Sequence, residues 1–252
     1  MLLSLLVALV PAAWPAPDAT LHAPQLPSTP AHKIRVFVDA GHGAPDNEGN
    51  HGCSCQAEQD HTLRVAQHLA FVLAATGRFE VKLSRTTDFP RYQARIAAAE
   101  AWRADVIISL HSDARGEAHG FPGADGGTCW RNPDAPGIAV LWNDEGPAFS
   151  AREKLGRAVG TRLREAGFPA YSGIDYGDLY RHDDHEPSGW IDTRPMKKRV
   201  YFLRASAIPT VIIETHHALD VLEVARWEEL ATVDAFAFAV GAAVLDDQGV
   251  VK

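Results

Sequence analysis

The sequence predicts a single α/β domain whose sheet is mixed but mostly parallel, with helices on both faces. Three observations lead to this prediction. Short apolar runs typical of buried strands recur along the chain, amphipathic helical patterns separate the first of them, and no internal repeat divides the chain. Repeated alternation of strands and helices indicates parallel strands, because each parallel pair needs a crossover connection. We therefore expect one sheet and one domain.

The composition excludes some classes of protein. The chain has 252 residues and a formal net charge of -8, and its longest basic block is Lys197-Lys198-Arg199. Nucleic-acid binding is therefore not expected, because it needs a concentrated basic surface. Twelve histidines are a generous number, and several follow apolar runs directly, which favours a transition-metal site.

The N-terminal residues have the pattern of a secretory signal. Leu2 to Val10 are almost wholly apolar, and a Pro/Ala-rich segment without periodicity follows them to about residue 31. The apolar stretch is too short to span a bilayer permanently. We expect residues 1–32 to be a signal peptide and leader, residues 33–247 to be the folded domain, and the protein to be exported to the periplasm or the cell exterior. No transmembrane span is expected elsewhere.

The first half of the chain alternates strands and helices. A strand over residues 36–38 ends in Asp39-Ala40-Gly41-His42-Gly43, and a polar Gly/Asn/His loop follows it. Apolar residues at three- and four-residue steps then predict a helix over residues 57–76, which places Glu58 in its first turn. Residues 79–83 and 106–111 predict two further strands, with a helix over residues 90–103 between them.

The second half predicts fewer regular elements. We expect strands over residues 138–142, 199–204 and 210–214, a helix over residues 151–166, and a closing helix that ends near Leu245. Residues 112–137 and 168–198 lack periodicity and are expected to be irregular. Irregular segments of this length in one domain are often functional.

Three predicted elements deliver polar side chains that suit a metal. His42 and His111 follow strands, and Glu58 begins the helix between them. Parallel strands end at the same edge of a sheet, where ligands usually bind. Catalytic zinc takes three such ligands and leaves a fourth position for water. The alternative is that both histidines are hydrogen-bonded residues at the sheet edge and that Glu58 interacts with the helix dipole.

Glu214 is the candidate general base. It follows Val211-Ile212-Ile213, so it lies at the edge of the core, where partial desolvation raises a carboxyl pKa. The alternative is an ordinary strand-end residue paired with Arg204 or His216. Asp39 is a candidate partner that orients a metal ligand, and Gly41 and Gly43 let the backbone turn close to the metal.

The cysteines are odd in number. Cys53 or Cys55 could form a disulfide with Cys129 and leave one thiol over. A thiolate zinc site and unreactive free thiols are the alternatives.

Five motifs occur in the order and at roughly the spacing of a known family. They are Asp39-Ala40-Gly41-His42-Gly43, Glu58, Leu83-Ser84-Arg85 with Asp88, Ile108-Ser109-Leu110-His111-Ser112-Asp113-Ala114 and Ile208-Pro209-Thr210-Val211-Ile212-Ile213-Glu214. Together they resemble the zinc-dependent N-acetylmuramoyl-L-alanine amidases of the amidase 3 family. The resemblance extends from about Ile34 to Leu245.

The resemblance implies a function and roles for the residues. It implies that His42, Glu58 and His111 bind Zn²⁺ and that Glu214 is the catalytic carboxylate. It implies hydrolysis of the amide between N-acetylmuramic acid and the L-alanine of the peptidoglycan stem peptide. We also expect the protein to be a monomer, and a protein activator could regulate it. The alternative functions are a zinc hydrolase of a small N-acyl amino acid and a non-catalytic wall-binding zinc protein.

Two segments depart from the family pattern. His216 and His217 replace the usual turn after the glutamate. They could stabilise an oxyanion, add a metal ligand or be polar residues at the edge of the site. The aromatic-rich stretch from Tyr171 to Trp190 could be a lid that contacts sugar or peptide, or a small core of its own. Autoinhibition by a long helix there is disfavoured by its prolines and glycine.

Overall fold

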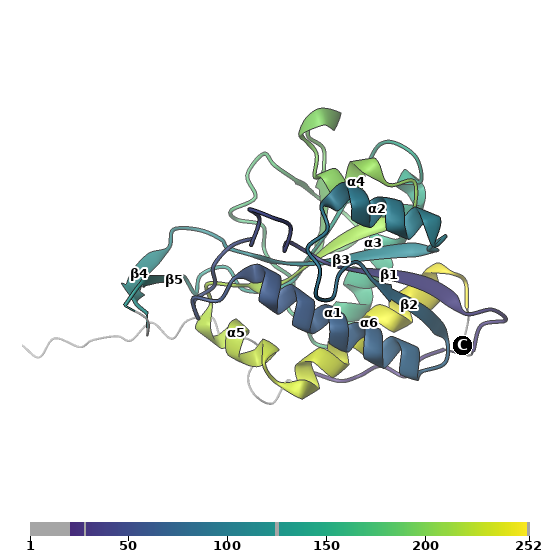
Figure 1. Cartoon of the computed structure of the whole chain (residues 1–252), viewed down its shortest axis with the longest axis horizontal. Coiled ribbons are helices and arrows are strands. Elements are labelled where there is room, and N and C mark those ends of the chain that lie inside the picture. Colours follow the sequence, from purple (N-terminus) through teal and green to yellow (C-terminus); the bar gives the residue numbers. More distant parts are fainter. Residues whose placement is uncertain (1–20, 28, 124–125, 251–252) are drawn as a thin grey trace, which may run out of the picture.

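A seven-stranded sheet forms the centre of the molecule (Figure 1). The computed structural model describes residues 21–27, 29–123 and 126–250. The strand order is β2-β1-β3-β9-β6-β8-β7. The strands are β1 (Ile34–Ala40), β2 (Phe79–Leu83), β3 (Val106–Asp113), β6 (Ala139–Asn143), β7 (Arg181–His182), β8 (Gly189–Asp192) and β9 (Thr210–His217).

The sheet is mixed and mostly parallel, as the sequence predicts. β1 pairs in parallel with β2 and β3, β3 with β9, and β6 with β8. β6 runs antiparallel to β9, and β7 runs antiparallel to β8. The carboxyl ends of β1, β3 and β9 consequently meet at one edge, which carries the candidate site.

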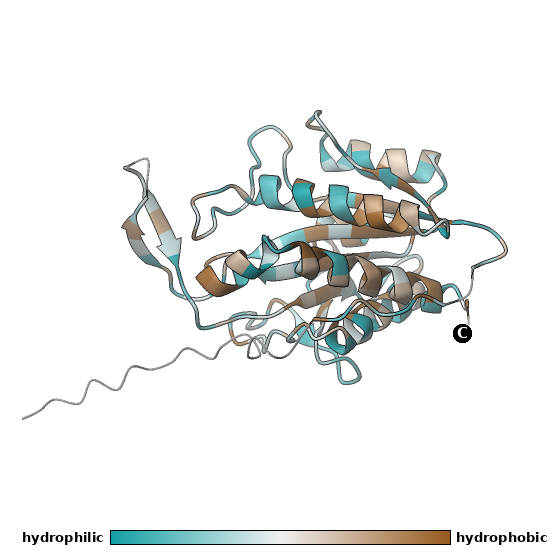
Figure 2. Ribbon diagram, turned by 90° about the horizontal axis from the view of Figure 1, so that it is seen from below, coloured by the Kyte–Doolittle hydropathy of each residue, from teal (hydrophilic) through white to brown (hydrophobic). Residues whose placement is uncertain are grey.

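Helices cover both faces of the sheet (Figure 2). Along β1, Val36 and Val38 pack into the core beneath α1, α3 and α6, whereas Phe37 packs into the core beneath α2 and α4. This alternation follows from the period-two geometry of a strand. The helices are α1 (Glu58–Ala75), α2 (Tyr92–Ala101), α3 (Phe149–Glu165), α4 (Tyr201–Ala205), α5 (Val221–Trp227) and α6 (Leu230–Asp247).

The amphipathic pattern correctly located α1. Its buried residues include Val65, Leu69 and Val72, which recur at three- and four-residue steps and face the sheet. Gly77, just beyond the helix, has a φ of 73° and so adopts the left-handed conformation that often terminates a helix. The helix therefore starts at Glu58 beside the sheet edge and carries the chain away from it.

The prediction of a strand over residues 199–204 is wrong. A short 3-10 helix, η1 (Met196–Lys198), and α4 occupy this region. Phe202 and Leu203 are buried in the core on the α2 side. A short apolar run fits a single helical turn as well as a strand, so periodicity could not distinguish them.

The two segments expected to be irregular contain strands. Residues 112–137 hold an antiparallel hairpin of β4 (His119–Pro122) and β5 (Thr128–Arg131). Residues 168–198 hold β7 and the fully buried β8. These strands are two to four residues long, which is too short to produce a readable alternation. The predicted closing helix is divided into α5 and α6.

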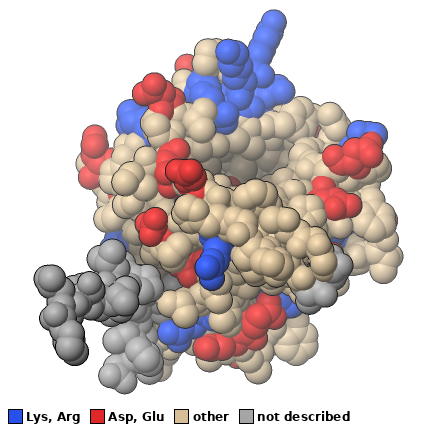
Figure 3. Space-filling model, turned by 90° about the vertical axis from the view of Figure 1, so that its left-hand side faces the viewer, with Lys and Arg blue, Asp and Glu red and all other residues tan. Residues whose placement is uncertain are grey.

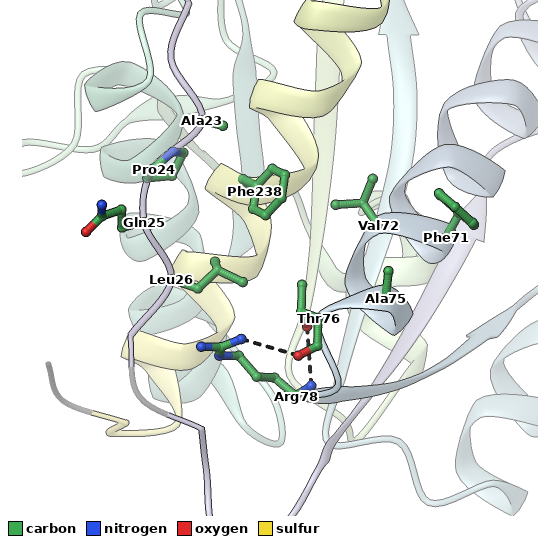
Figure 4. A pocket seen from close by; sticks show the side chains of 10 residues that line it. All are labelled: Ala23, Pro24, Gln25, Leu26, Phe71, Val72, Ala75, Thr76, Arg78 and Phe238. Carbon is green, nitrogen blue, oxygen red and sulfur yellow. Dashed lines mark hydrogen bonds between the residues drawn. The ribbon is translucent and has the colours of Figure 1, made fainter.

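Residues 21–27, which the sequence assigns to the leader, lie against the domain. His22 N donates to Ala166 O at 3.2 Å, and Arg78 Nε donates to Pro27 O at 3.1 Å. An apolar pocket of about 760 Å³ lies between this segment, α1 and α6, with Leu26, Val72 and Phe238 in its wall (Figure 4). The pocket contains none of the predicted site residues. The predicted signal sequence lies outside the described residues.

No helix in the described part of the chain is both long enough and apolar enough to cross a membrane.

Candidate active site

The loop after β1 brings its backbone very close to His111. A Cβ atom on Gly41 would lie 2.6 Å from His111 Cε1, so a side chain there would collide with the imidazole ring. His42 has a φ of 59° and Gly43 a φ of 73°. The chain therefore turns sharply through the left-handed region, and only glycine at position 41 allows the close approach.

The three predicted ligands converge at this edge. His42 Nε2 lies 3.1 Å from Glu58 Oε2, and His111 Nδ1 lies 3.2 Å from Glu58 Oε1. One candidate ligand atom from each of the three residues lies within 4.8 Å of the others. The side chains come from the β1 loop, the start of α1 and the end of β3. Sheet topology thus assembles a group that is widely spaced in the sequence.

The carboxylate of Glu58 is held by several donors. Asn50 N and Asn50 Nδ2 donate to Oε2 at 3.1 and 2.9 Å, and Ser112 N donates to Oε1 at 2.9 Å. Burial raises the pKa of Glu58, but its hydrogen bonds and charge interactions with His111 and His42 outweigh burial and hold the pKa well below its ordinary value. Glu58 is therefore a fixed anion, which suits a cation beside it.

His42 is oriented by Asn47, a residue that the sequence analysis missed. The Oδ1 atom of Asn47 lies 2.7 Å from His42 Nδ1, and Asn47 Nδ2 donates to Tyr92 OH at 3.1 Å. An amide oxygen only accepts, so Nδ1 carries a proton, and Nε2 is the ring nitrogen that faces Glu58. The Gly/Asn/His composition of this loop was the available signal, but it did not single out position 47.

Asp39, the candidate partner of a metal ligand, makes no hydrogen bond to the imidazole of His42 or His111. Its carboxylate accepts hydrogen bonds from Arg95 Nη1 at 3.1 Å and from Ser109 Oγ at 2.7 Å. Arg95 in turn donates to the backbone carbonyls of Ala40 and His42. Asp39 therefore supports the backbone of the turn through Arg95.

Glu214 lies in register with His111 on the neighbouring parallel strand β9. Residues paired in register have their side chains on the same face of the sheet. Glu214 is 9% exposed, and its Oε2 has no hydrogen-bond partner among the described residues. Burial raises its pKa well above the ordinary value, and the charges of Asp113 and Glu58 act in the same direction, whereas Arg115 opposes them. A carboxyl group in this setting has a strong affinity for a proton.

The left-hand side of Figure 1 carries this edge of the sheet, and Figure 3 shows that the surface there is hollowed near its centre. A substrate therefore has access from this side.

Comparison with known proteins identifies the family. The chain matches the model of the Amidase_3 family, described as N-acetylmuramoyl-L-alanine amidase, over residues 36–246. The chain belongs to this family. The match covers all of the predicted site residues, and it confirms the resemblance seen in the sequence motifs.

Individual relatives match this amidase domain in part. AmiC of Escherichia coli, an N-acetylmuramoyl-L-alanine amidase, is 35% identical over 82 residues, which are 32% of this chain and 19% of AmiC. CwlM of Bacillus licheniformis, also named as such an amidase, is 33% identical over 98 residues, which are 36% of this chain and 37% of CwlM. The chain thus spans well under two thirds of the length of these curated relatives.

A solved structure shows the same fold. The amidase Ami1 of Mycobacterium smegmatis superposes with a TM-score of 0.66 at 20% identity, covering 86% of this chain and 97% of Ami1.

The three candidate ligands of this amidase domain are residue types that can bind zinc. Bonds of about 2.0 to 2.1 Å around a tetrahedral zinc place neighbouring ligand atoms roughly 3.3 Å apart. With one ligand atom from each residue, the three atoms lie within 4.8 Å of one another, and the separations of 3.1 and 3.2 Å run to different oxygens of Glu58. Two imidazoles and one carboxylate are a ligand set that zinc accepts.

His216 and His217 lie in the interior of the amidase domain. His216 stacks on Trp227 with ring centroids 5.8 Å apart, and its Nδ1 lies 3.0 Å from Thr215 Oγ1. His217 Nδ1 accepts from Arg115 N at 3.2 Å. Burial lowers the pKa of both histidines, so both are neutral. Neither belongs to the group of potential metal ligands among the described residues.

The aromatic segment forms a small core, which was one of the two predicted alternatives. Tyr171, Tyr176 and Trp190 are 1%, 6% and 6% exposed, and the ring centroids of Tyr176 lie 4.9 and 5.0 Å from those of the other two. Arg115 stacks on the Tyr171 ring at 3.8 Å. A lid that presents these rings to a substrate is therefore excluded.

Cys55 and Cys129 form a disulfide, and Cys53 is a buried free thiol. One of the two predicted pairings is therefore correct. The thiolate zinc site is excluded, because two of its three sulfurs are bonded to each other.

Proposed function

We propose that the chain is a zinc-dependent peptidoglycan amidase. It would hydrolyse the amide between N-acetylmuramic acid and the L-alanine of the stem peptide. The observation that carries the proposal is the convergence of His42, Glu58 and His111 at one sheet edge, with the buried Glu214 in register beside His111. Membership of the amidase family supports the substrate.

In this proposal His42 Nε2, His111 Nδ1 and the Glu58 carboxylate hold the zinc. Zinc bound by such a group lowers the pKa of a water molecule and polarises a carbonyl oxygen. Asn47 keeps the proton of His42 on Nδ1, so that Nε2 remains a donor of electrons. The hydrogen bonds from Asn50 and Ser112 hold Glu58 in place.

Glu214 supplies the acid–base chemistry. Its unpaired oxygen accepts the proton of the attacking water as the C–O bond forms, and it then gives this proton to the nitrogen of L-alanine as the C–N bond breaks. The proton affinity that burial gives Glu214 suits both steps, because the same carboxyl must take up and release a proton.

Three further properties accompany this proposal. The apolar stretch from Leu2 to Val10 supports export to the periplasm or the cell exterior. Action as a monomer and regulation by a protein activator are further predictions.

The experiment compares two substrates with the zinc-loaded full chain. We expect release of stem peptides from purified sacculi, with about one zinc ion bound per chain. Removal of zinc by a chelator should abolish the release, and zinc should restore it. Hydrolysis of small N-acyl amino acids without any release from sacculi would favour the small-substrate hydrolase. Tight zinc and sacculus binding without hydrolysis of either substrate would favour the wall-binding protein.

A further inference from the structure

The β4–β5 hairpin projects beyond the body of the domain at the edge that carries the candidate site (Figures 1 and 2). Its strands pair antiparallel, with Gly120 opposite Trp130 and Phe121 opposite Cys129. Side chains alternate across a strand, so Gly120 and Trp130 share one face and Phe121 and Cys129 the other. The disulfide between Cys129 and Cys55 joins the Phe121 and Cys129 face to the loop before α1. The face with Gly120 and Trp130 therefore points away from this loop. We call the first face, Gly120 and Trp130, the outer face.

The outer face presents a supported aromatic ring. Trp130 is 45% exposed, which is high for so large an apolar side chain. A Cβ atom on Gly120 would lie 3.4 Å from Trp130 Cζ3, so the indole packs against the backbone of Gly120. The same Cβ atom would lie 3.0 Å from Thr128 Cγ2, so a larger residue at position 120 would crowd this face of the hairpin. One side of the ring therefore packs on the hairpin, while much of its surface remains open to solvent.

Three connections hold the hairpin relative to the candidate site. β3, which contains His111, leads into the hairpin through residues 114–118. Cys55 lies in the loop that ends at Glu58, and its disulfide fixes β5. Asn132 lies just after β5 and donates its backbone N–H to Leu219 O at 2.9 Å. Leu219 in turn lies two residues after β9, the strand that carries Glu214. Each element that supplies a site residue is thus joined to the base of the hairpin or to β5.

We propose that the outer face of the hairpin binds the glycan strand of peptidoglycan beside the amide to be cleaved. The inference rests on the proposed function, because it assumes a polymeric substrate that extends beyond the catalytic residues. Amphipathic sugar rings stack on flat aromatic faces, and neighbouring polar groups can bind their hydroxyls. Thr128 is exposed on the same face as Trp130 and supplies such a hydroxyl group, whereas His119 and Arg131 lie on the opposite face.

The charge of the hairpin agrees with this ligand. Neither β4 nor β5 contains an aspartate or glutamate, whereas the whole chain has a net charge of -8. A polymer that carries carboxylates is therefore not repelled at this position. Tyr171, Tyr176 and Trp190 are buried and cannot contact a sugar. Trp130 is the exposed indole on the hairpin and takes that role in the proposal.

The test compares Trp130→Ala with the unchanged chain on three probes. The probes are glycan strands stripped of stem peptides, intact sacculi and a soluble muramyl peptide. We expect Trp130→Ala to weaken binding to the stripped strands about tenfold, the effect of losing one aromatic contact. Release of stem peptides from sacculi should slow by a similar factor, whereas hydrolysis of the soluble muramyl peptide should stay within about twofold, because its bond lies at the catalytic residues. Trp130→Phe should retain part of the binding.

A matched control is Phe71→Ala. Phe71 is 71% exposed on α1, far along the helix from Glu58, so its removal should leave all three measurements unchanged. Cys129→Ser removes the tether between the hairpin and the loop before α1. It should weaken glycan binding in the same direction as Trp130→Ala. Reductant should lower the glycan binding of the unchanged chain but not that of Cys129→Ser.

Several results would overturn the proposal. Unchanged binding of stripped strands by Trp130→Ala would remove its basis, as would an equal loss of hydrolysis on the soluble muramyl peptide. A change in oligomeric state, measured by analytical ultracentrifugation, would assign the outer face to contacts between copies of the chain. Failure of the proposed function is distinct: the unchanged chain would then hydrolyse neither substrate, while its binding to stripped strands could still be measured.

Discussion

Glu214 and His111 are paired in register on the neighbouring parallel strands β9 and β3, so a buried carboxyl group and a candidate metal ligand lie on the same face of the sheet. Because β3 and β9 are hydrogen-bonded neighbours, this relationship is part of the fold and does not depend on a flexible loop.

Glu214→Gln should keep the shape of the site but lose the proton acceptor. We expect the rate of peptide release from sacculi to fall by about 10² to 10⁴, the usual contribution of a general base. Zinc content should be unchanged, because Glu214 is not among the candidate ligands. Measured zinc content and release rate test both statements, with Glu100→Gln, an exposed residue on α2, as the control. Undiminished release by Glu214→Gln would remove Glu214 from the mechanism.

Asn47→Ala should weaken zinc binding without removing a ligand. The substitution deletes the acceptor of the His42 Nδ1 proton, so the imidazole loses its preferred tautomer and orientation. We expect zinc affinity to fall about 10- to 100-fold, as is typical for partners of metal ligands. Competition with a chromophoric chelator measures the affinity. Asn47→Asp keeps an acceptor and should retain most of it, and equal zinc affinity in all three proteins would contradict the role of Asn47.

Much of this site was accessible from the sequence. His42, Glu58 and His111 each lie where a predicted element starts or ends. The spacing of the apolar residues located these elements, and parallel pairing of the strands predicts that their ends lie at one edge of the sheet. Asn47 and Arg115 were missed because their roles depend on the conformation of irregular loops. Such loops have no periodic pattern from which side-chain contacts could be predicted. The position of His217 inside β9 was missed because polar residues that extend a buried strand look like the start of a loop.

Gly41→Ala should displace His111. The added methyl group would lie 2.6 Å from the His111 ring, and the ring lies next to Glu58. We expect a large loss of zinc affinity and of peptide release. Gly77→Ala is the control, because a Cβ atom there meets nothing within 4 Å and the change costs only backbone strain of about 1 kcal/mol. If Gly41→Ala binds zinc as tightly as Gly77→Ala, the close approach of the turn to His111 has no functional importance.

Glu223 should make stability depend on pH. Burial raises its pKa to about 7, although backbone hydrogen bonds from His217 and Gly137 and the charge of Arg115 oppose this. The unfolded chain releases this proton near pH 4.3. The folded state therefore binds the proton more tightly, so the free energy of unfolding should fall as the pH rises from about 4.3 to 7 and level off above.

The expected size of the Glu223 effect is roughly 3 to 4 kcal/mol, because each unit of difference between the folded and unfolded pKa is worth about 1.36 kcal/mol. Urea denaturation at several pH values measures it. In Glu223→Gln this part of the pH dependence should disappear, whereas Glu100→Gln should keep it. An unchanged slope in Glu223→Gln would show that other groups cause the dependence.

The most direct test of the central claim is an anomalous-diffraction map of zinc-loaded crystals. The account predicts one zinc ion bonded to His42 Nε2, His111 Nδ1 and an oxygen of Glu58 at about 2.0 to 2.2 Å. Glu214 should be close to the ion but not bonded to it. Zinc at another position, or a zinc ion that lacks one of these three ligands, would contradict the account.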